Sequence, residues 1–315
     1  MLQPANAKQS ALVFGSINLD LVAKTPQLPI PGKTLQAHEF FTAPGGKGAN
    51  QAVALARLGV ATQMIGRVGD DNFGSELLDS LKAAGVQTEC ILVDDTVSSG
   101  VALINVDDAG ENQIVIVSGA NGCIDSSDLE CLDSLLPDAF AVLMQFEIPM
   151  PSIVLAAQAA KQNGVKVILD PAPANTIPVE LYPLVDIITP NQTEIEQLVG
   201  FDVSEIDLAT EAAKILLQRG VGCAIVKLGA QGAVCVTSEE TFFVPAFAVT
   251  TVDTVAAGDA FNGGLVAALV EGLSLQQAVV WGAAAGAIAT TKSGAQSSMP
   301  TRDTLIAFLQ ARGAI

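Results

Sequence analysis

The chain has 315 residues, of which 50% are hydrophobic and only 4% are aromatic. This length is sufficient for a sizeable core, and the scarcity of aromatic residues favours an α/β interior over an aromatic-rich β-sandwich. The formal net charge of −18 argues against a nucleic-acid partner. Because the overall field repels anions, any anionic ligand needs a locally positive site.

The use of cysteine and histidine narrows the kinds of site that the chain can form. An odd number of cysteines, scattered without a C-x-x-C pair, predicts reduced thiols in the core. The cysteines are Cys90, Cys123, Cys131, Cys223 and Cys235. The sole histidine, His38, argues against a histidine metal cluster and a Ser-His-Asp triad, and we expect it at the surface or in a strand.

Two segments bear on targeting. Residues 1–10 are polar and contain no hydrophobic signal core. The apolar stretch 265–288 is interrupted by Glu271-Gly272 and Gln276-Gln277, so it predicts two buried helices instead of a membrane span. We therefore expect a cytoplasmic protein with no membrane partner.

The first half of the chain contains two kinds of predicted element. Residues 11–14 form an apolar run that predicts a central strand, whose end delivers Asn18 and Asp20. Residues 48–58 and 74–84 predict helices that each stop at a glycine.

Three further strand-like segments do not alternate with helices. They are residues 35–42, 101–106 and 113–117, and a turn at 107–110 joins the last two into a hairpin. We expect them to form a small separate sheet that covers one end of the main domain.

From about residue 139, strands and helices alternate regularly. The expected strands are residues 141–145, 165–169, 184–188 and 223–227, with a hairpin of 233–236 and 241–244. The expected helices are residues 150–163, 192–198, 207–219 and 260–270. This alternation implies right-handed crossovers and a mostly parallel sheet covered on both faces. With no linker or repeat, the sequence predicts one domain over residues 1–315.

One motif combines an anion site with a carboxylate. Asp253-Thr254-Val255-Ala256-Ala257-Gly258-Asp259 opens the apolar helix 260–270. Its small residues leave backbone N–H groups at a helix start open to an anion. A carboxylate at such a site, here Asp259, suggests a base that acts on a hydroxyl beside a phosphate. The alternative is an acidic N-cap.

A second motif is Gly45-Gly46-Lys47-Gly48-Ala49-Asn50. Its glycines permit close backbone approach and positive φ before a helix. Lys47 and Asn50 are placed to present an amine and an amide to a small polar ligand. A glycine-rich loop with a solvated lysine is the alternative.

The two motifs together resemble the signatures of the PfkB, or ribokinase-type, carbohydrate kinase family. Further stretches resemble the same family in the same order, from about residue 11 to 300. They are residues 15–20, 110–112 with 119–121, 145–149, 171–174, 189–194 and 294–296.

The resemblance implies a ribokinase-like three-layer α/β/α domain with a mostly parallel central sheet and a small β-sheet lid. The lid would comprise about residues 34–43 and 97–118 and would form the contact of a homodimer. The implied activity is ATP-dependent phosphorylation of D-ribose at O5. A sister kinase acting on deoxyribose, fructose or a nucleoside is the alternative, and a non-catalytic sugar-binding regulator is a remote one. Nucleotide preference and regulation by phosphate stay open.

The resemblance also implies a role for individual residues. Asp259 would be the base, and the amides of Ala256, Ala257 and Gly258 would form an anion hole. The sugar is expected against Asn18, Asp20, Gly46, Lys47, Asn50, Glu147 and Asp259. Turn chemistry is the alternative for Asn18 and Asp20, and a surface charge is the alternative for Glu147.

Nucleotide and metal sites follow from the same resemblance. ATP is expected against Asn191, Lys227, Gly229, Gly232 and Gly258. Glu194 would hold Mg²⁺, through water, or would only cap its helix. An activating monovalent cation, K⁺, is expected at Asp253, Val255, Ala289, Lys292, Gly294 and Ser298, and the alternative is that Asp253 only caps its loop.

Overall fold

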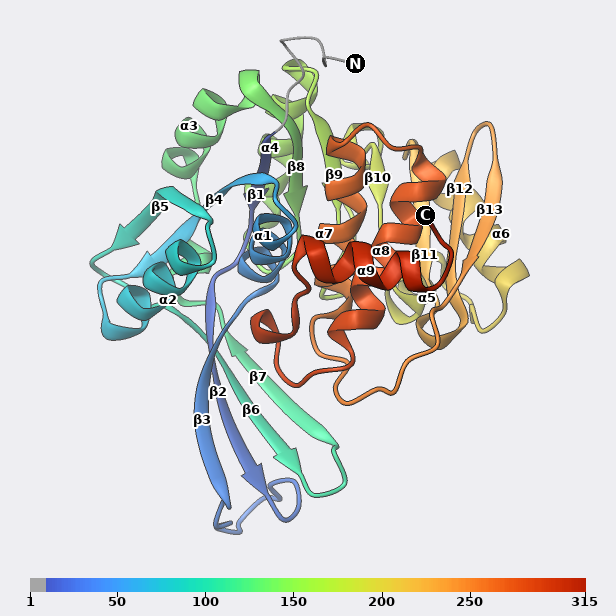
Figure 1. The fold of residues 1–315 in the computed structure, drawn as a ribbon. Helices are drawn as coiled ribbons and strands as arrows, with labels where there is room; N and C mark the ends of the chain where they lie inside the picture. Colours follow the sequence, from blue (N-terminus) through green and yellow to red (C-terminus); the bar gives the residue numbers. More distant parts are fainter. Residues whose placement is uncertain (1–9) are drawn as a thin grey trace.

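The computed structural model describes residues 10–315, so the expectation for the polar N-terminus concerns residues 1–9 that lie outside the described part. Within that part, nine strands form the main sheet in the order β13-β12-β11-β10-β9-β8-β1-β4-β5 (Figure 1). Their bounds are β1 Ser10–Phe14, β4 Ala61–Gly69, β5 Gln87–Asp94, β8 Ala139–Met144, β9 Lys166–Leu169, β10 Ile187–Ile188, β11 Cys223–Lys227, β12 Gly232–Thr237 and β13 Thr241–Pro245. Only the pairs β11–β12 and β12–β13 among them are antiparallel.

Helices cover both faces of this sheet, because its central strands are apolar on both sides. In β1, Ala11 and Val13 belong to one buried cluster, whereas Leu12 and Phe14 belong to the other. The first cluster is covered by α1 Lys47–Arg57, α2 Asn72–Ala83, α7 Ala257–Val270, α8 Leu275–Ala289 and α9 Arg302–Ala311. The second is covered by α3 Ser126–Leu135, α4 Met150–Gln162, α5 Gln192–Val199 and α6 Ile206–Gln218. The predicted three-layer α/β/α architecture is confirmed.

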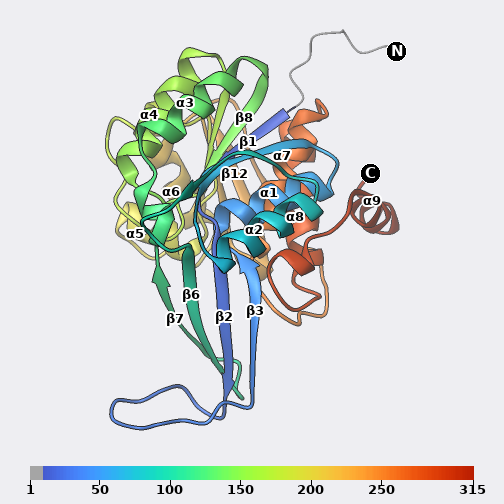
Figure 2. The same ribbon diagram turned by 90° about the vertical axis from the view of Figure 1, so that its left-hand side faces the viewer.

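A second sheet extends away from the body (Figures 1 and 2). Its strand order is β3-β2-β6-β7, with β2 Asn18–Thr25, β3 Glu39–Gly45, β6 Gly100–Asp107 and β7 Asn112–Val117. The sequence predicts three of these strands and misses β2, which only three residues separate from β1. The chain therefore bends at residues 15–17, and Asn18 starts a strand of the second sheet instead of ending one of the first.

The expectation that all five cysteines are reduced is wrong. Cys90 of β5 and Cys131 of α3 form a disulfide, while Cys123, Cys223 and Cys235 are free. The two half-cystines are 41 residues apart in the chain, and the packing of α3 beside β5 brings them together. The sole histidine, His38, lies at the surface beside Asp108, as expected.

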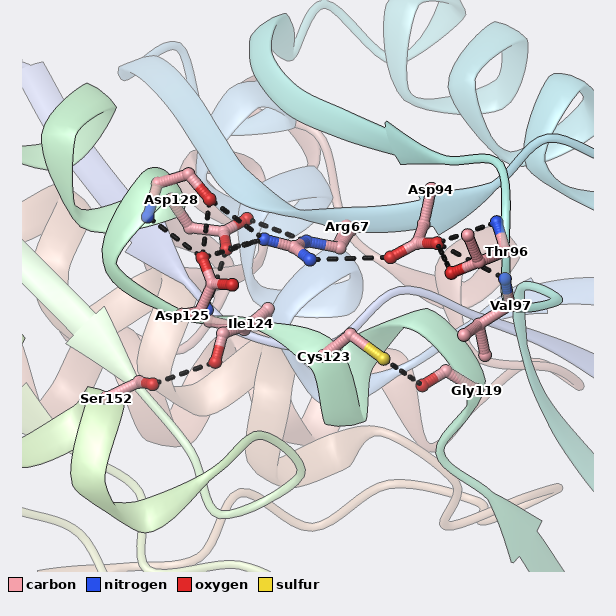
Figure 3. Close-up of polar contacts among 11 residues, drawn as sticks. Arg67, Asp94, Thr96, Val97, Gly119, Cys123, Ile124, Asp125, Asp128 and Ser152 are labelled. Atoms are coloured by element: carbon pink, nitrogen blue, oxygen red, sulfur yellow. Dashed lines mark hydrogen bonds and ion pairs between the residues drawn. The ribbon is translucent and has the colours of Figure 1, made fainter.

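A buried arginine joins the segments that connect the two sheets (Figure 3). The guanidinium of Arg67, on β4, lies 2.5 Å from Asp128, 3.1 Å from Asp125 and 3.4 Å from Asp94. Asp94 ends β5 just before the chain enters β6, and Asp125 caps α3 just after the chain leaves β7. Arg67 thus fixes both crossings between the body and the second sheet.

Between residues 10 and 315, no helix combines the length and the apolar character that crossing a membrane would require. The apolar stretch 265–288 instead forms the C-terminal part of α7 and nearly all of α8, which pack against each other.

Candidate active site

The N-terminus of α7 opens into a cleft of about 650 Å³. No side chain caps this helix, and Ala256 at its start is the one non-glycine residue of the described chain with positive φ, at 56°. Such a backbone conformation carries strain that the surrounding structure must compensate. Ala256, Ala257 and Gly258 line the cleft, and the Ala257 N–H also donates to the Thr254 carbonyl at 3.3 Å. Because the first amides of a helix lack intrahelical partners, this end of α7 can bind an anion.

Asp259 lies in the first turn of α7 and is only 4% exposed. Its carboxylate accepts hydrogen bonds of 3.0 Å from the side-chain amides of Asn50 and Gln51. Burial raises the pKa of Asp259 to about 6, and the charge of Lys47 opposes this rise. A carboxyl group with this pKa is ionised at neutral pH and can still accept a proton readily.

Lys47 is the first residue of α1, and several carboxylate side chains lie near its ammonium group. Gly46 before it has a φ of 87°, and a Cβ at this position would approach the Asn18 nitrogen to 2.7 Å, so glycine is required. Burial alone would lower the pKa of Lys47, but the surrounding acidic groups, above all Asp259 and Asp170, raise it instead. Lys47 therefore stays charged in the cleft.

A second cavity, of about 360 Å³, lies where the second sheet meets the body. Asn18 and Glu147 line it, together with Asn121 and with Ile116 of β7. Asn121 donates 2.7 Å to the Asn18 side-chain oxygen, and Glu147 accepts from the Lys47 backbone N–H at 3.1 Å. The polar side chains are thus held by protein partners and pre-organised for a small ligand.

Asp20 belongs to the same group of side chains. Burial, with the nearby charge of Glu147, raises the pKa of Asp20 to about 7. The charge of Glu147 therefore opposes ionisation of Asp20 until hydroxyl donors or cations balance it.

The other end of the large cleft is built from strand ends and an apolar wall. Asn191, Lys227, Gly229, Gly232 and Glu194 line it. Phe247, Ala283 and Ala287 are among its apolar lining residues, which suit a flat aromatic ligand.

Glu194 caps the helix α5. It accepts from the backbone N–H of Asn191 at 2.7 Å and from the Asn191 side chain at 2.8 Å, and Asn191 in turn accepts from the Glu194 N–H at 2.8 Å. Asn191 and Glu194 therefore form a capping box at the start of α5, and the role of Glu194 in binding Mg²⁺ stays a prediction. Burial raises the pKa of Glu194, and the charge of Lys227 works against that rise.

Asp253 forms hydrogen bonds to two of the segments that are expected to hold a monovalent cation. Its two carboxylate oxygens accept from the backbone N–H groups of Val255, at 3.0 Å, and Gly294, at 2.9 Å. Ala289 ends α8, Lys292 follows it, and Ser298 is fully buried with its hydroxyl on the Ala295 carbonyl. Over residues 10–315, no group of three His, Cys, Asp or Glu side chains is arranged to hold a metal ion.

Three polar residues of the site were not given a role from the sequence: Gln51, Asn121 and Asp170. Gln51 follows Asn50 directly, and Asp170 precedes Pro171 at the end of β9, so both adjoin motifs that point to the site. Their contacts, however, join residues more than 100 positions apart, which no spacing rule indicates.

Comparison with known proteins agrees with this geometry. The family model of the pfkB carbohydrate kinases matches residues 8–302. The chain belongs to this family. It is therefore a carbohydrate kinase, as its two signature motifs predict.

Individual relatives extend over nearly the whole chain. A ribokinase of Haemophilus influenzae is 41% identical over 303 residues, which cover 96% of this chain and 99% of that protein. A deoxyribokinase of Salmonella typhi is 35% identical over 298 residues, with 94% and 97% covered. The structure of Arabidopsis thaliana ribokinase complexed with ribose and ATP superposes with a TM-score of 0.89 at 33% identity, covering 96% of this chain and 99% of that one.

Proposed function

We propose that the protein transfers the γ-phosphoryl group of ATP to O5 of D-ribose and releases ribose 5-phosphate and ADP. The observation that carries this proposal is the buried Asp259 carboxylate beside the uncapped N-terminus of α7. A base next to an anion site is what transfer of a phosphoryl group to a hydroxyl requires. The ribokinase from Haemophilus influenzae and the ribose and ATP complex of the Arabidopsis enzyme support the substrates.

In this reaction, the oxygen of the sugar hydroxyl forms a bond to the γ-phosphorus, and Asp259 accepts the proton that this hydroxyl loses. The bond between that phosphorus and the bridging oxygen of ADP breaks. The amides of Ala256, Ala257 and Gly258 stabilise the charge on the transferred group, and the ammonium of Lys47 stands beside it. Since Asp259 has a pKa of about 6, it is ready to accept this proton at neutral pH.

The sugar would be held by Asn18, Asp20, Gly46, Lys47, Asn50 and Glu147. Carboxylates and amides supply the paired donors and acceptors that a polyol requires. ATP would extend along the cleft against Asn191, Lys227, Gly229, Gly232 and Gly258, with its base near the apolar wall.

Two metal ions fit the oxygen donors of the site. Mg²⁺ would neutralise phosphate charge, and Glu194 would hold it through water, because its carboxylate is already a helix cap and Mg²⁺ retains much of its hydration shell. A monovalent cation would take oxygens of Asp253 and Ser298 and the carbonyls of Val255, Ala289, Lys292 and Gly294. These are hard donors of the kind K⁺ prefers.

The second sheet would act as a lid of a single domain over residues 1–315. Ile116 on β7 and Asn18 on β2 already line the cavity that the sugar would occupy. Closure would exclude water, which otherwise competes as phosphoryl acceptor. The exposed apolar side chains of this sheet would be covered by a second copy of the chain.

The decisive experiment is a coupled ADP-release assay with ATP, Mg²⁺ and K⁺ across D-ribose, 2-deoxyribose, fructose, adenosine and a blank without sugar. The highest kcat/KM is expected for D-ribose. A lead for 2-deoxyribose would favour the alternative that the 35% identical deoxyribokinase suggests. Absence of ADP release with every sugar would contradict the proposal and favour a regulator.

Two arms of the same assay test the site. Asp259→Asn is expected to lower kcat by roughly 10²-fold or more while sugar binding persists, since general base catalysis contributes on that scale. Asp133→Asn, on the exposed side of α3, is the matched control.

Replacing K⁺ by a large organic cation in the same assay is expected to lower activity. Unchanged activity after this exchange would exclude the cation site.

A further inference from the structure

A line of hydrogen-bonded side chains runs beneath the cleft and ends at Asp259. Its centre is Gln51 of α1, which is 1% exposed. The Nε2 of Gln51 donates to Asp259 Oδ1 at 3.0 Å and to Asp170 Oδ2 at 2.9 Å. The other oxygen of Asp170 accepts from Lys227 Nζ at 3.0 Å. The line therefore joins Asp259 to a lysine in the ATP half of the cleft.

A neutral amide suits the chemistry of this junction. A primary amide nitrogen carries two hydrogens, so Gln51 can donate to two ionised carboxylates at once, which neither a hydroxyl nor an acid can do. The oxygen of Gln51 accepts from Gln145 Nε2 at 2.7 Å, which fixes the end of the amide that faces the carboxylates. Gln145 is itself fully buried and packs against Gly15, where a Cβ would overlap its side-chain oxygen.

We propose that Gln51 is a positioning residue for phosphoryl transfer, which orients the Asp259 carboxylate and links it through Asp170 to Lys227. This inference rests on the proposed role of Asp259 as the base. Four other charged groups face or line the same space: Lys47 from α1, Asp170 directly after β9, Glu194 from α5 and Lys227 from β11. Among them Gln51 is the neutral donor that separates the two aspartates.

The two neighbours of Asp259 act on its ionisation in opposite directions. Hydrogen bonds from Gln51 lower the pKa of Asp259, whereas the charge of Asp170 raises it. Since the ionised form is the active base, kcat falls as pH drops through this pKa. Loss of the Gln51 donors therefore moves the acidic limb of the kcat profile to higher pH, and loss of the Asp170 charge moves it to lower pH.

The test measures kcat and KM against pH for Gln51→Met and Asp170→Asn with the best sugar of the substrate assay. For Gln51→Met we expect kcat to fall about tenfold or more at neutral pH, as for a lost hydrogen bond to a charged group, while KM for the sugar changes far less. We expect its acidic limb to move up, and that of Asp170→Asn to move down. Gln63→Met, at a buried glutamine of β4 remote from the cleft, is the control and should keep the wild-type profile.

The outcomes separate this inference from the proposed function. An Asp259→Asn variant with wild-type kcat would overturn the base itself. An inactive Asp259→Asn variant beside a Gln51→Met variant with an unmoved acidic limb would overturn only the role of Gln51. If Gln51→Met does not fold, Asp170→Asn decides alone, and a limb that fails to move to lower pH overturns the proposal.

Discussion

Asp259 illustrates how an active-site carboxyl group works against the stability of its fold. Its pKa rises from an ordinary value of 3.8 to about 6, mainly because it is buried. The folded state therefore binds this proton more tightly than the unfolded state does. The free energy of unfolding falls as pH rises from about 4 to 6, and the full cost is present above pH 6.

We expect Asp259→Asn to be more stable than the wild type at pH 8, by roughly 3 kcal/mol, since each pKa unit corresponds to about 1.4 kcal/mol. The neutral amide resembles the protonated acid, so this gain should shrink as pH falls through 6 and vanish below about 4. Urea unfolding at pH 8 and at pH 4 measures both values. A gain of equal size at the two pH values would show that ionisation of Asp259 is not its source, and Asp133→Asn should show no gain at either.

Among the elements, those whose ends are set by local chemistry could be predicted from the sequence. The helices that begin at Lys47 and Ala257 follow glycine-rich and small-residue turns, and both were expected within a few residues of their true start. Strand β2 was missed because only the neighbouring strands, β3 and β6, show that it belongs to a second sheet. The sequence predicts no element at strands β4 and β5 or at helices α3 and α9.

The contacts of the site likewise divide into those that the sequence indicates and those that only the fold brings together. Sequence motifs indicate the carboxylates, the lysines and the glycine turns of the site, because each of these lies in a short, recognisable run of residues. The bridge from Gln51 to Asp170, the disulfide of Cys90 and the partners of Arg67 depend on elements packed together from distant parts of the chain. Such contacts are consequences of the fold, so a single sequence does not indicate them.

The Arg67 cluster gives a prediction for the elements that it joins. Asp128 is fully buried and lies 2.5 Å from the guanidinium, so Arg67→Met would leave an uncompensated buried charge. We expect a loss of roughly 3–5 kcal/mol in the free energy of unfolding. Adding Asp128→Asn should recover part of that loss, because the charge is then gone. Chemical denaturation of the two variants measures this, and equal stability of single and double variants would contradict it.

At the scale of the whole molecule, the second sheet projects from the body, and no further strand among residues 10–315 pairs with its edge strands β3 and β7 (Figures 1 and 2). One row across it is apolar throughout, with Phe41, Val22, Ile104 and Ile114 side by side in register. Phe41 is 38% exposed and Ile114 is 51% exposed. A partner that covers an apolar face with open edges stabilises it by removing apolar surface from water. A second copy of this chain can cover the face with its own identical face.

We therefore expect the wild type to sediment at twice the 32.3 kDa of one chain, and Phe41→Glu combined with Ile114→Glu to sediment as a single chain. The charges would face each other across the contact, where like charges repel in a desolvated setting. Val179→Glu, at an apolar residue that is 81% exposed elsewhere on the surface, is the control and should leave the mass unchanged. A wild type that sediments as one chain at every concentration would contradict the dimer. A double variant that keeps the doubled mass would place the contact on another surface, and the lid would then close over its sugar without help from a partner.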